Sequence, residues 1–435
     1  MPDSHTTLTT RKTVAPAIFT PARIIMAVAG VTLAATLVIA AAMQPATLPA
    51  APAAPAAPAG PAGVIRHGLT APLPRTPGTI RLATYNIENL FDDKDDPTLS
   101  GEQEDKEMTK PLAHREAVAA AIKAIDADVI ALQEIESLQA LTWFRDTHLQ
   151  GLGYDHIASL DSGDGRGIEC SVISRFPIIE SKVYAGVALG GIHPAKWGNE
   201  ENRDAGQPVV FRRSPLLARI VIPAEKIAKL AAVEGSMIAK DVPSPESAKP
   251  YELDLFVIHF KSGRPGGYWR EAEARKTGEL ANEVLKANAE ANVVILGDFN
   301  AQMNEEPMKI LAKAGWNNLL ADRAARDSRT TTHSSDRTID HVLYSSTLSG
   351  EMLFPSRFVL GTMNRPSGQD WRTTPPPAGY AADHYPLVVD IAPVNRAESK
   401  EIPTMPGANP AAASSASSSL TPTPTPAKPT AEPAK

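Results

Sequence analysis

Cysteine is almost absent from this chain of 435 residues, since Cys170 is the only one. An intramolecular disulfide is therefore impossible, and the fold has to be stabilised by packing. Cys170 lies in the apolar stretch 168–173, where it is most simply a small strand residue and not a nucleophile.

Several signatures of ligand binding are also missing. The sequence contains no internal repeat, no glycine-rich loop that could cradle a phosphate, and no spacing typical of zinc ligands around His193, His333 or His341. It has no run of basic residues, and its net charge is −6. The simplest electrostatic case for a tight nucleic-acid binder is thus excluded, although a local basic groove stays open.

The N-terminal segment, residues 1–44, contains an apolar run without charge at 24–43, preceded by Arg23 and other basic residues. Its length and flanks predict either a cleaved export signal or an uncleaved N-terminal membrane anchor. A buried globular helix is the third alternative, but the run is apolar on every face. Both favoured alternatives place the rest of the chain outside the cytoplasm.

Composition separates the remaining chain into three segments. Residues 45–77 are rich in alanine and proline and are expected to form a semi-rigid spacer, and residues 396–435 form a Pro/Ser/Thr/Ala-rich tail predicted to be disordered. Residues 78–395 remain, which is enough to bury one large core.

Three apolar runs lead directly into polar side chains, where a core strand should carry none. The run at 293–296 leads to Asp298 and Asn300, that at 129–132 to Glu134, and that at 255–258 to His259. Two other apolar runs begin with polar residues, at Asp340 and at Asp383 and His384. If strands of the two kinds are antiparallel neighbours, all these side chains meet at one rim of a sheet. That rim is the candidate active site.

The helices predicted from periodicity and termination signals lie at 112–125, at 268–286, and from Pro307 to about Gly315. Residues 223–250 are expected to be a surface insertion between two strands. Strands and helices mix without strict alternation, which favours a layered α/β fold with mixed sheets over a Rossmann fold or a barrel.

The polar residues at the rim suit phosphate-ester hydrolysis. A hard cation such as Mg²⁺ prefers oxygen ligands, which Glu134 and Asp383 provide. Hydrolysis also needs a positioned water, a proton acceptor, and donors to the charge that develops on phosphorus. The residues that offer these functions are Asp298, His384, His259, Asn86 and Asn300.

Six segments resemble, in the same order, the motifs of the endonuclease/exonuclease/phosphatase superfamily. They are residues 84–91, 132–134, 257–262, 297–300, 339–342 and 383–386. That superfamily includes deoxyribonucleases, abasic-site endonucleases, neutral sphingomyelinases and inositol polyphosphate phosphatases. The resemblance implies a four-layer α/β sandwich, in which two mixed β-sheets are flanked by helices and the site lies at their common edge.

The resemblance also implies roles for individual residues. Glu134 would be the principal ligand of Mg²⁺ or Mn²⁺, with Asn86 and Asp383 nearby. His384, oriented by Asp340, would act as general base or contact the phosphate.

Three further residues take roles by the same resemblance. Asp298 would align the attacking water, Asn300 would donate to the transition state, and His259 would contact the phosphate or assist the leaving group.

Two substrate contacts stay open from the sequence. Lys261 would either meet a substrate phosphate or be solvated. Arg213 belongs to an Arg-Arg pair similar to one in secreted bacterial members, but Ser214 replaces the proline that follows there.

The favoured interpretation is an extracytoplasmic, metal-dependent nuclease, with nucleic acid as its partner and 24–43 as a membrane tether if uncleaved. The alternatives are a phosphatase or a phospholipase C-like enzyme of the sphingomyelinase or inositol phosphatase type, acting on another phosphoester, or an inactive surface binding module. No protein partner is indicated.

Overall fold

The computed structural model describes residues 63–94, 108–323, 328–366 and 374–396. The apolar run at 24–43, residues 45–62 of the expected spacer and residues 397–435 of the tail lie outside the described residues. Within the described ranges, no helix combines the length and apolar character needed to cross a membrane.

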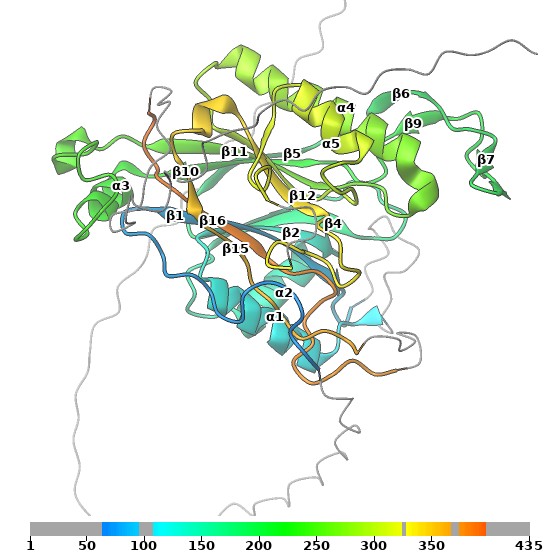
Figure 1. The fold of residues 1–435 in the computed structure, drawn as a ribbon, viewed down its shortest axis with the longest axis horizontal. Coiled ribbons are helices and arrows are strands. Elements are labelled where there is room, and N and C mark those ends of the chain that lie inside the picture. The colour runs from blue at the N-terminus through cyan, green and yellow to red at the C-terminus, as the bar shows by residue number, and fades with distance from the viewer. Residues whose placement is uncertain (1–62, 95–107, 324–327, 367–373, 397–435) are drawn as a thin grey trace, which may run out of the picture. The chain divides into compact units, whose positions relative to one another are not determined.

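Two six-stranded sheets form the centre of the domain, and each mixes parallel and antiparallel strands (Figure 1). The first sheet has the order β15 (Met352–Val359), β16 (Leu387–Ile391), β1 (Ile80–Leu90), β2 (Val129–Ile135), β4 (Glu169–Ser174) and β3 (His156–Ser159). The second has the order β13 (Asn317–Asn318), β14 (Asp340–Tyr344), β12 (Val293–Asp298), β11 (Tyr251–His259), β10 (Leu216–Ile222) and β5 (Ile178–Val183).

Helices cover the outer faces of both sheets. Figure 1 shows α1 (Leu112–Ile125) and α2 (Leu138–His148) beside the first sheet, and α4 (Gly267–Ala287) and α5 (Glu306–Lys313) beside the second. The result is a four-layer α/β sandwich, which confirms the predicted fold class. The connections carry α3 (Ala224–Ala231) and two small sheets, in which β6 (Ala188–Ile192) pairs with β9 (Pro208–Val210) and β7 (Lys196–Trp197) with β8 (Glu200–Glu201).

The central strands are apolar on both faces because each face meets another layer. In β12, Val294 and Leu296 belong to the core between the sheets, whereas Val293 and Ile295 pack in the core beneath α4 and α5. This alternation explains why the sequence shows an unbroken apolar run there.

The predicted helices are confirmed, and α1 has the predicted bounds, 112–125, with Val118, Ala121, Ile122 and Ile125 buried. The expectation for 223–250 needs correction, because Ile227, Ile238 and Val242 of this insertion are buried in the core between the sheets. It therefore closes one end of the sandwich and is not only a surface feature.

Residues 63–77 also differ from the spacer expected there, since they lie along the domain. We call them the N-terminal strap. Val64 and Leu69 form β-bridges with Asn364 and Leu360, and the backbone N–H of Thr76 donates to Oδ2 of Asp390 at 2.9 Å. An extended, proline-rich chain suits such pairing along an edge, because it needs few hydrogen bonds of its own.

The carboxylate that anchors the strap is part of a buried ion pair. Asp390 is fully buried, and its Oδ1 lies 2.7 Å from Nε of Arg81, its partner in the register of β1 and β16. A buried charge must be paired and hydrogen-bonded to be tolerated. The backbone N–H of Thr76 adds a hydrogen bond to this carboxylate from the strap. The Oγ of Ser356 accepts the backbone N–H of Asp390 at 2.8 Å and so holds the main chain of the same residue.

We expect the strap to contribute measurably to stability. A shortened chain that begins at Gly78 should be less stable than one that begins at Gly63 by about 2 kcal/mol, because Leu69 and Leu73 lose their partly buried packing and Asp390 loses one donor. Thermal unfolding of the two chains measures the difference, expected as a few degrees in Tm. Equal Tm values would show that the strap is only loosely attached.

Candidate active site

Strand register brings three predicted residues side by side in the second sheet. His259 at the end of β11 pairs with Asp298 at the end of parallel β12, and Asp298 pairs with Asp340 at the start of antiparallel β14. The predicted meeting of strands that end and begin in polar residues is therefore confirmed in this sheet.

The first sheet repeats the arrangement with Asn86, Glu134 and His384. Asn86 lies in β1 and Glu134 in the parallel strand β2, while His384 comes three residues before antiparallel β16. Nδ2 of Asn86 lies 3.3 Å from Oε1 of Glu134 and 3.4 Å from Oδ2 of Asp298. Asn86 thus joins the polar edges of the two sheets.

In the first sheet, β1 and β2 continue past Asn86 and Glu134 through irregular backbone, whereas β11 and β12 of the second sheet end at His259 and Asp298. β1 extends to Leu90, and its register with β2 shifts between Asn86 and Leu90. Four non-glycine residues at the site have positive φ, namely Glu88 (53°), Asn89 (54°), Glu134 (66°) and Asn300 (48°). Such strained backbone positions persist where the surrounding structure enforces them. They turn toward the cleft side chains that a regular strand would bury.

Gly297 allows β12 to approach β11 closely just before Asp298. Its φ is +138°, and a Cβ there would lie 2.1 Å from the carbonyl oxygen of Ile258. No other residue fits this position without moving the backbone. The glycine therefore sets the place of Asp298 beside His259.

His384 and Asp340 form the strongest charge pair of the site. Nδ1 of His384 lies 2.8 Å from Oδ2 of Asp340, and both side chains are buried. Although burial disfavours the imidazolium, the carboxylates of Asp340 and Asp298 raise the pKa of His384 well above its ordinary value. His384 therefore holds its proton to higher pH than an ordinary histidine in the metal-free protein, and its Nε2 lies 3.8 Å from Oδ2 of Asp298.

Asp298 is buried and held by Asn300. The backbone N–H of Asn300 donates to Oδ1 at 2.8 Å, and its side-chain Nδ2 donates to Oδ2 at 3.0 Å. Burial raises the pKa of Asp298 to about 6, while the charge of His384 acts in the opposite direction. A carboxylate with this pKa is ionised at pH 7 and more basic than an ordinary aspartate, as suits a group that accepts a proton from water.

His259 is paired with Arg213, which confirms neither predicted role for His259 but fixes its protonation. Nη1 of Arg213 lies 2.8 Å from Nε2 of His259, and because arginine can only donate, Nε2 carries no proton. Burial, followed by the charge of Arg213, lowers the pKa of His259 well below its ordinary value. Arg213 is thus the cation that this side of the site presents, and it is itself held by Asp164 at 3.2 Å.

Glu134 is bound by a cation that the sequence did not reveal. Nη2 of Arg166 lies 3.1 Å from Oε2 of Glu134, and the N–H of Asn89 donates to the same oxygen at 3.1 Å. Arg166 lies in the loop before β4, outside every motif quoted above, so no sequence signal marked it.

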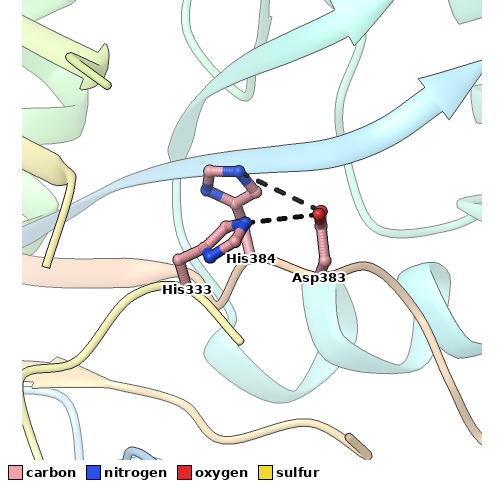
Figure 2. Close-up of side chains that lie close together, drawn as sticks. All are labelled: His333, Asp383 and His384. Carbon is pink, nitrogen blue, oxygen red and sulfur yellow. Dashed lines mark ion pairs between the residues drawn. The ribbon is translucent and has the colours of Figure 1, made fainter. Parts of the chain in front are cut away.

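Asp383 points toward two histidines, as Figure 2 shows. Nε2 of His333 lies 3.3 Å from its Oδ2, and Nε2 of His384 lies 4.0 Å from its Oδ1. Burial acts to raise the pKa of Asp383, but the hydrogen bond from His333 and the charge of His384 hold it below its ordinary value. His333 had no spacing partner in the sequence, because its partner is fifty residues away along the chain.

The donor set fits a hard divalent cation. Two groups of described side chains lie close enough to share one ion, His333 with Asp383 and His384, and Asp298 with Asp340 and His384. They overlap with the predicted ligands only at Asp383. Asp383 keeps 37% and Glu134 11% of the side chain exposed, so both offer carboxylate oxygens to an ion that also retains water.

The role of Asn86 as a metal ligand stays a prediction, and in this structure its side chain is hydrogen-bonded within the site. Its Nδ2 faces Glu134 and Asp298, and its Oδ1 accepts the backbone N–H of Glu88 at 3.0 Å. In this arrangement Asn86 donates to the two carboxylates and orients them.

These residues line an open cleft of about 690 Å³. The predicted residues at its wall are Glu134, His259, Asp298, Asn300, Asp383 and His384. Lys261 is not among them, because its Nζ lies 5.0 Å from the ring centroid of Trp197 and donates to the carbonyl of Ser262 at 3.1 Å. Burial, followed by Arg213, lowers the pKa of Lys261 to about 8.

The cleft has further walls that the sequence analysis missed. They include Arg66 of the strap, Arg365, Tyr380 and Glu88. The hydroxyl of Tyr380 donates to Oε2 of Glu88 at 2.8 Å, and burial, followed by Asp383, raises the pKa of Glu88 to about 7. Glu88 lies two residues after Asn86 within the first motif, and this proximity was the available signal.

Comparison with known proteins supports the resemblance seen in the sequence. A family model described as the Endonuclease/Exonuclease/phosphatase family matches residues 83–353. A search of curated proteins finds no match.

Solved structures with a similar fold are distant in sequence. The human Nocturnin catalytic domain with bound sulfate is 15% identical, with 72% of this chain and 94% of that chain covered and a TM-score of 0.43. The mannosyl-6-phosphatase Bt3783 of Bacteroides thetaiotaomicron is 16% identical, with 72% and 99% covered and a TM-score of 0.42. Truncated TDP2 of Caenorhabditis elegans is 15% identical, with 73% and 99% covered and a TM-score of 0.41. Likenesses of this size say nothing about substrate.

Asp340→Asn should lower the pKa of His384, because the largest charge that stabilises the imidazolium is lost. Since a raised pKa means that the proton persists to higher pH, the substitution should move deprotonation to lower pH. Titration of the His384 ring by NMR, in metal-free protein, measures this shift. Turnover should fall by about 10²-fold or more, as when a group that orients a catalytic imidazole is removed.

The matched control is Asp336→Asn, which removes an exposed carboxylate 2.8 Å from His67 and leaves the site intact. An unchanged His384 titration in Asp340→Asn, or an equal loss of turnover in both variants, would contradict the role given to Asp340.

Proposed function

The chain belongs to the endonuclease/exonuclease/phosphatase family, whose members hydrolyse phosphoester bonds, and we propose that it is a metal-dependent nuclease acting outside the cytoplasm. One observation carries the catalytic part of the proposal. Asp298, His384, Glu134 and Asp383 line one open cleft, and buried Asp340 contacts His384 from behind the lining.

Attack of water on phosphorus needs a base and a stable place for negative charge. Asp298 is ionised at neutral pH, and the donors from Asn300 fix the direction in which its carboxylate faces. It therefore accepts the proton of the attacking water. The Nε2–H of the His384 imidazolium, on the other side, donates to the phosphate oxygens as their charge grows.

Glu134 and Asp383 would hold a divalent cation, Mg²⁺ or Mn²⁺, which supplies Lewis-acid stabilisation of phosphate charge when bound. Asn86 bridges Glu134 and Asp298 by donating to both. Arg166 lines the cleft and pairs with Glu134, and Arg213 donates to His259 of the cleft wall from outside the lining.

A polynucleotide is favoured as substrate by the guanidinium groups in the cleft, which can bind phosphates beside the reacting one. Arg66, Arg166 and Arg365 line the cleft from three distant segments of the chain, together with the carboxylates of Glu88, Glu134, Asp298 and Asp383. Local potential in a cleft, more than net charge, governs the attraction of a polyanion.

Purified protein should cleave plasmid DNA or RNA with Mg²⁺ or Mn²⁺ and lose this activity with chelator. His384→Ala and Asp298→Asn should each reduce turnover by about 10²-fold or more, because each removes a group that acts on the reacting atoms. Thermal unfolding of both variants controls for loss of fold.

The same assay, offered a phosphomonoester, inositol phosphates and sphingomyelin, tests the alternatives. Release of phosphate or phosphocholine without cleavage of nucleic acid would assign the protein to the phosphatase or phospholipase branch. An absence of turnover on every substrate would support a binding module.

The location outside the cytoplasm rests on the apolar run 24–43. The protein recovered from its native cell should be found outside the cytoplasm, either shortened near residues 40–42 by signal cleavage or intact in the membrane fraction. Cell fractionation with N-terminal sequencing distinguishes the two. Intact protein in the soluble cytoplasmic fraction would contradict export.

A further inference from the structure

A second pocket of about 470 Å³ adjoins the active-site cleft, and Asn300 lines both. Its lining residues, which we call the arginine pocket, are Gly263, Arg264, Arg270, Asn300, Gln302, Glu305 and Arg337. Nothing in the proposed chemistry uses its three arginines.

The charge of the arginine pocket is not balanced by its own residues. Glu305 is its single carboxylate, and it lies 3.5 Å from Nη2 of Arg337. Among the residues that the structure describes, no ion pair joins Arg264 or Arg270 to a carboxylate. Within the lining of the pocket, three guanidinium groups thus face one carboxylate, while Glu273 and Asp298 act on Arg270 from outside the lining.

Arg270 is the unusual member, because it is only 8% exposed. Its Nη1 donates to the carbonyl oxygens of Lys261 and Gly263 at 2.9 and 2.6 Å, and its Nε has no hydrogen-bond partner. The two carbonyls fix the guanidinium without neutralising it.

The energetics of Arg270 indicate a missing anion. Burial lowers the pKa of Arg270, Glu305 and Glu273 oppose this, and Arg337 adds to it. A buried cation without a partner is costly, and proteins keep one where a ligand completes the pairing. The fixed fork of arginine suits a phosphate, which it can bind with two parallel hydrogen bonds.

The arginine pocket is tied to the catalytic residues through Asn300. Nη2 of Arg337 donates to the backbone oxygen of Asn300 at 3.4 Å, and the same residue holds Asp298 through its N–H and its Nδ2. An anion in the arginine pocket would therefore lie next to the phosphate that Asp298 and His384 address.

We propose that the arginine pocket binds the phosphate that neighbours the scissile one in a nucleic acid strand. This inference rests on the proposed nuclease function and adds a specificity: the substrate must carry at least two phosphates in sequence. A strand is favoured over a single ester because two anion sites share one wall residue, and only a polymer fills both with one covalent chain.

Arg264→Gln is the first test, because Arg264 is exposed and its loss should not disturb folding. Its matched control is Arg275→Gln, which removes the same charge from an exposed position of α4 outside the pocket. Arg264→Lys retains the positive charge but loses the forked geometry of the guanidinium group. Kinetics are measured on a single-stranded DNA 12-mer and on bis(4-nitrophenyl) phosphate, which has one phosphate.

We expect Arg264→Gln to raise the KM for the 12-mer about tenfold, as loss of one charged hydrogen bond predicts, with kcat nearly unchanged. The salt dependence of log KM should become shallower by about one unit, the signature of one lost phosphate contact. The loss with the 12-mer should exceed that with bis(4-nitrophenyl) phosphate by about tenfold, and Arg264→Lys should be intermediate. Equal losses on both substrates, or equal behaviour of Arg264→Gln and Arg275→Gln, would overturn the inference.

A binding measurement separates this inference from the proposed function. In a His384→Ala background, fluorescence anisotropy of a labelled DNA 12-mer should show weaker binding after Arg264→Gln and not after Arg275→Gln. If the parent protein cleaves no nucleic acid but this difference holds, the nuclease proposal fails and the phosphate site stands. If the parent cleaves DNA and the difference is absent, the phosphate site fails alone.

Discussion

The whole site depends on one proton, which His384 holds between two buried carboxylates. Asp340 lies in β14 of the second sheet, Asp298 in β12 of the same sheet, and His384 before β16 of the first, so the 2.8 Å contact from His384 to Asp340 spans the two sheets. Two buried carboxylates repel one another unless a cation lies between them. Because His384 supplies that cation, a shift of one sheet against the other would leave both charges unpaired. The relative position of the two sheets therefore also fixes the pairing of the charged groups in the cleft.

Irregular backbone gives the sheets their reactive edge. In a regular strand the side chains point alternately to the two faces of the sheet. Both faces are covered in a sandwich, so a polar side chain of a regular strand would be buried. The positive φ of Glu134 and Asn300 turns these residues toward the cleft, and Gly297 lets β12 approach β11 just before Asp298. The strain is confined to a few residues at the rim, while the apolar layers on either side hold them in place.

Local sequence patterns predicted much of the fold and of the site, and for identifiable reasons. The apolar periodicity of α1 reflects the packing of one helix face against the first sheet. The polar residues at strand ends reflect the one sheet edge that they share. Residues 63–77 were misjudged because pairing of Leu69 with Leu360 is a tertiary contact that composition does not encode. Arg166 and His333 were missed because each reaches its partner from a loop whose path the sequence alone does not reveal.

The distribution of positive charge explains how an acidic protein can receive a polyanion. Most exposed acids are spread over the surface, where solvent and salt screen them within about 8 to 10 Å. Arg213 and Arg270 are instead largely buried at the site, where screening is weaker and their field persists. Each is held by neighbours that fix its direction, Asp164 for Arg213 and two carbonyls for Arg270. Among the residues that the structure describes, only Arg213 of the two forms an ion pair with a carboxylate. This difference between the two arginines indicates that an anion would bind beside Arg270, in the arginine pocket next to Asn300.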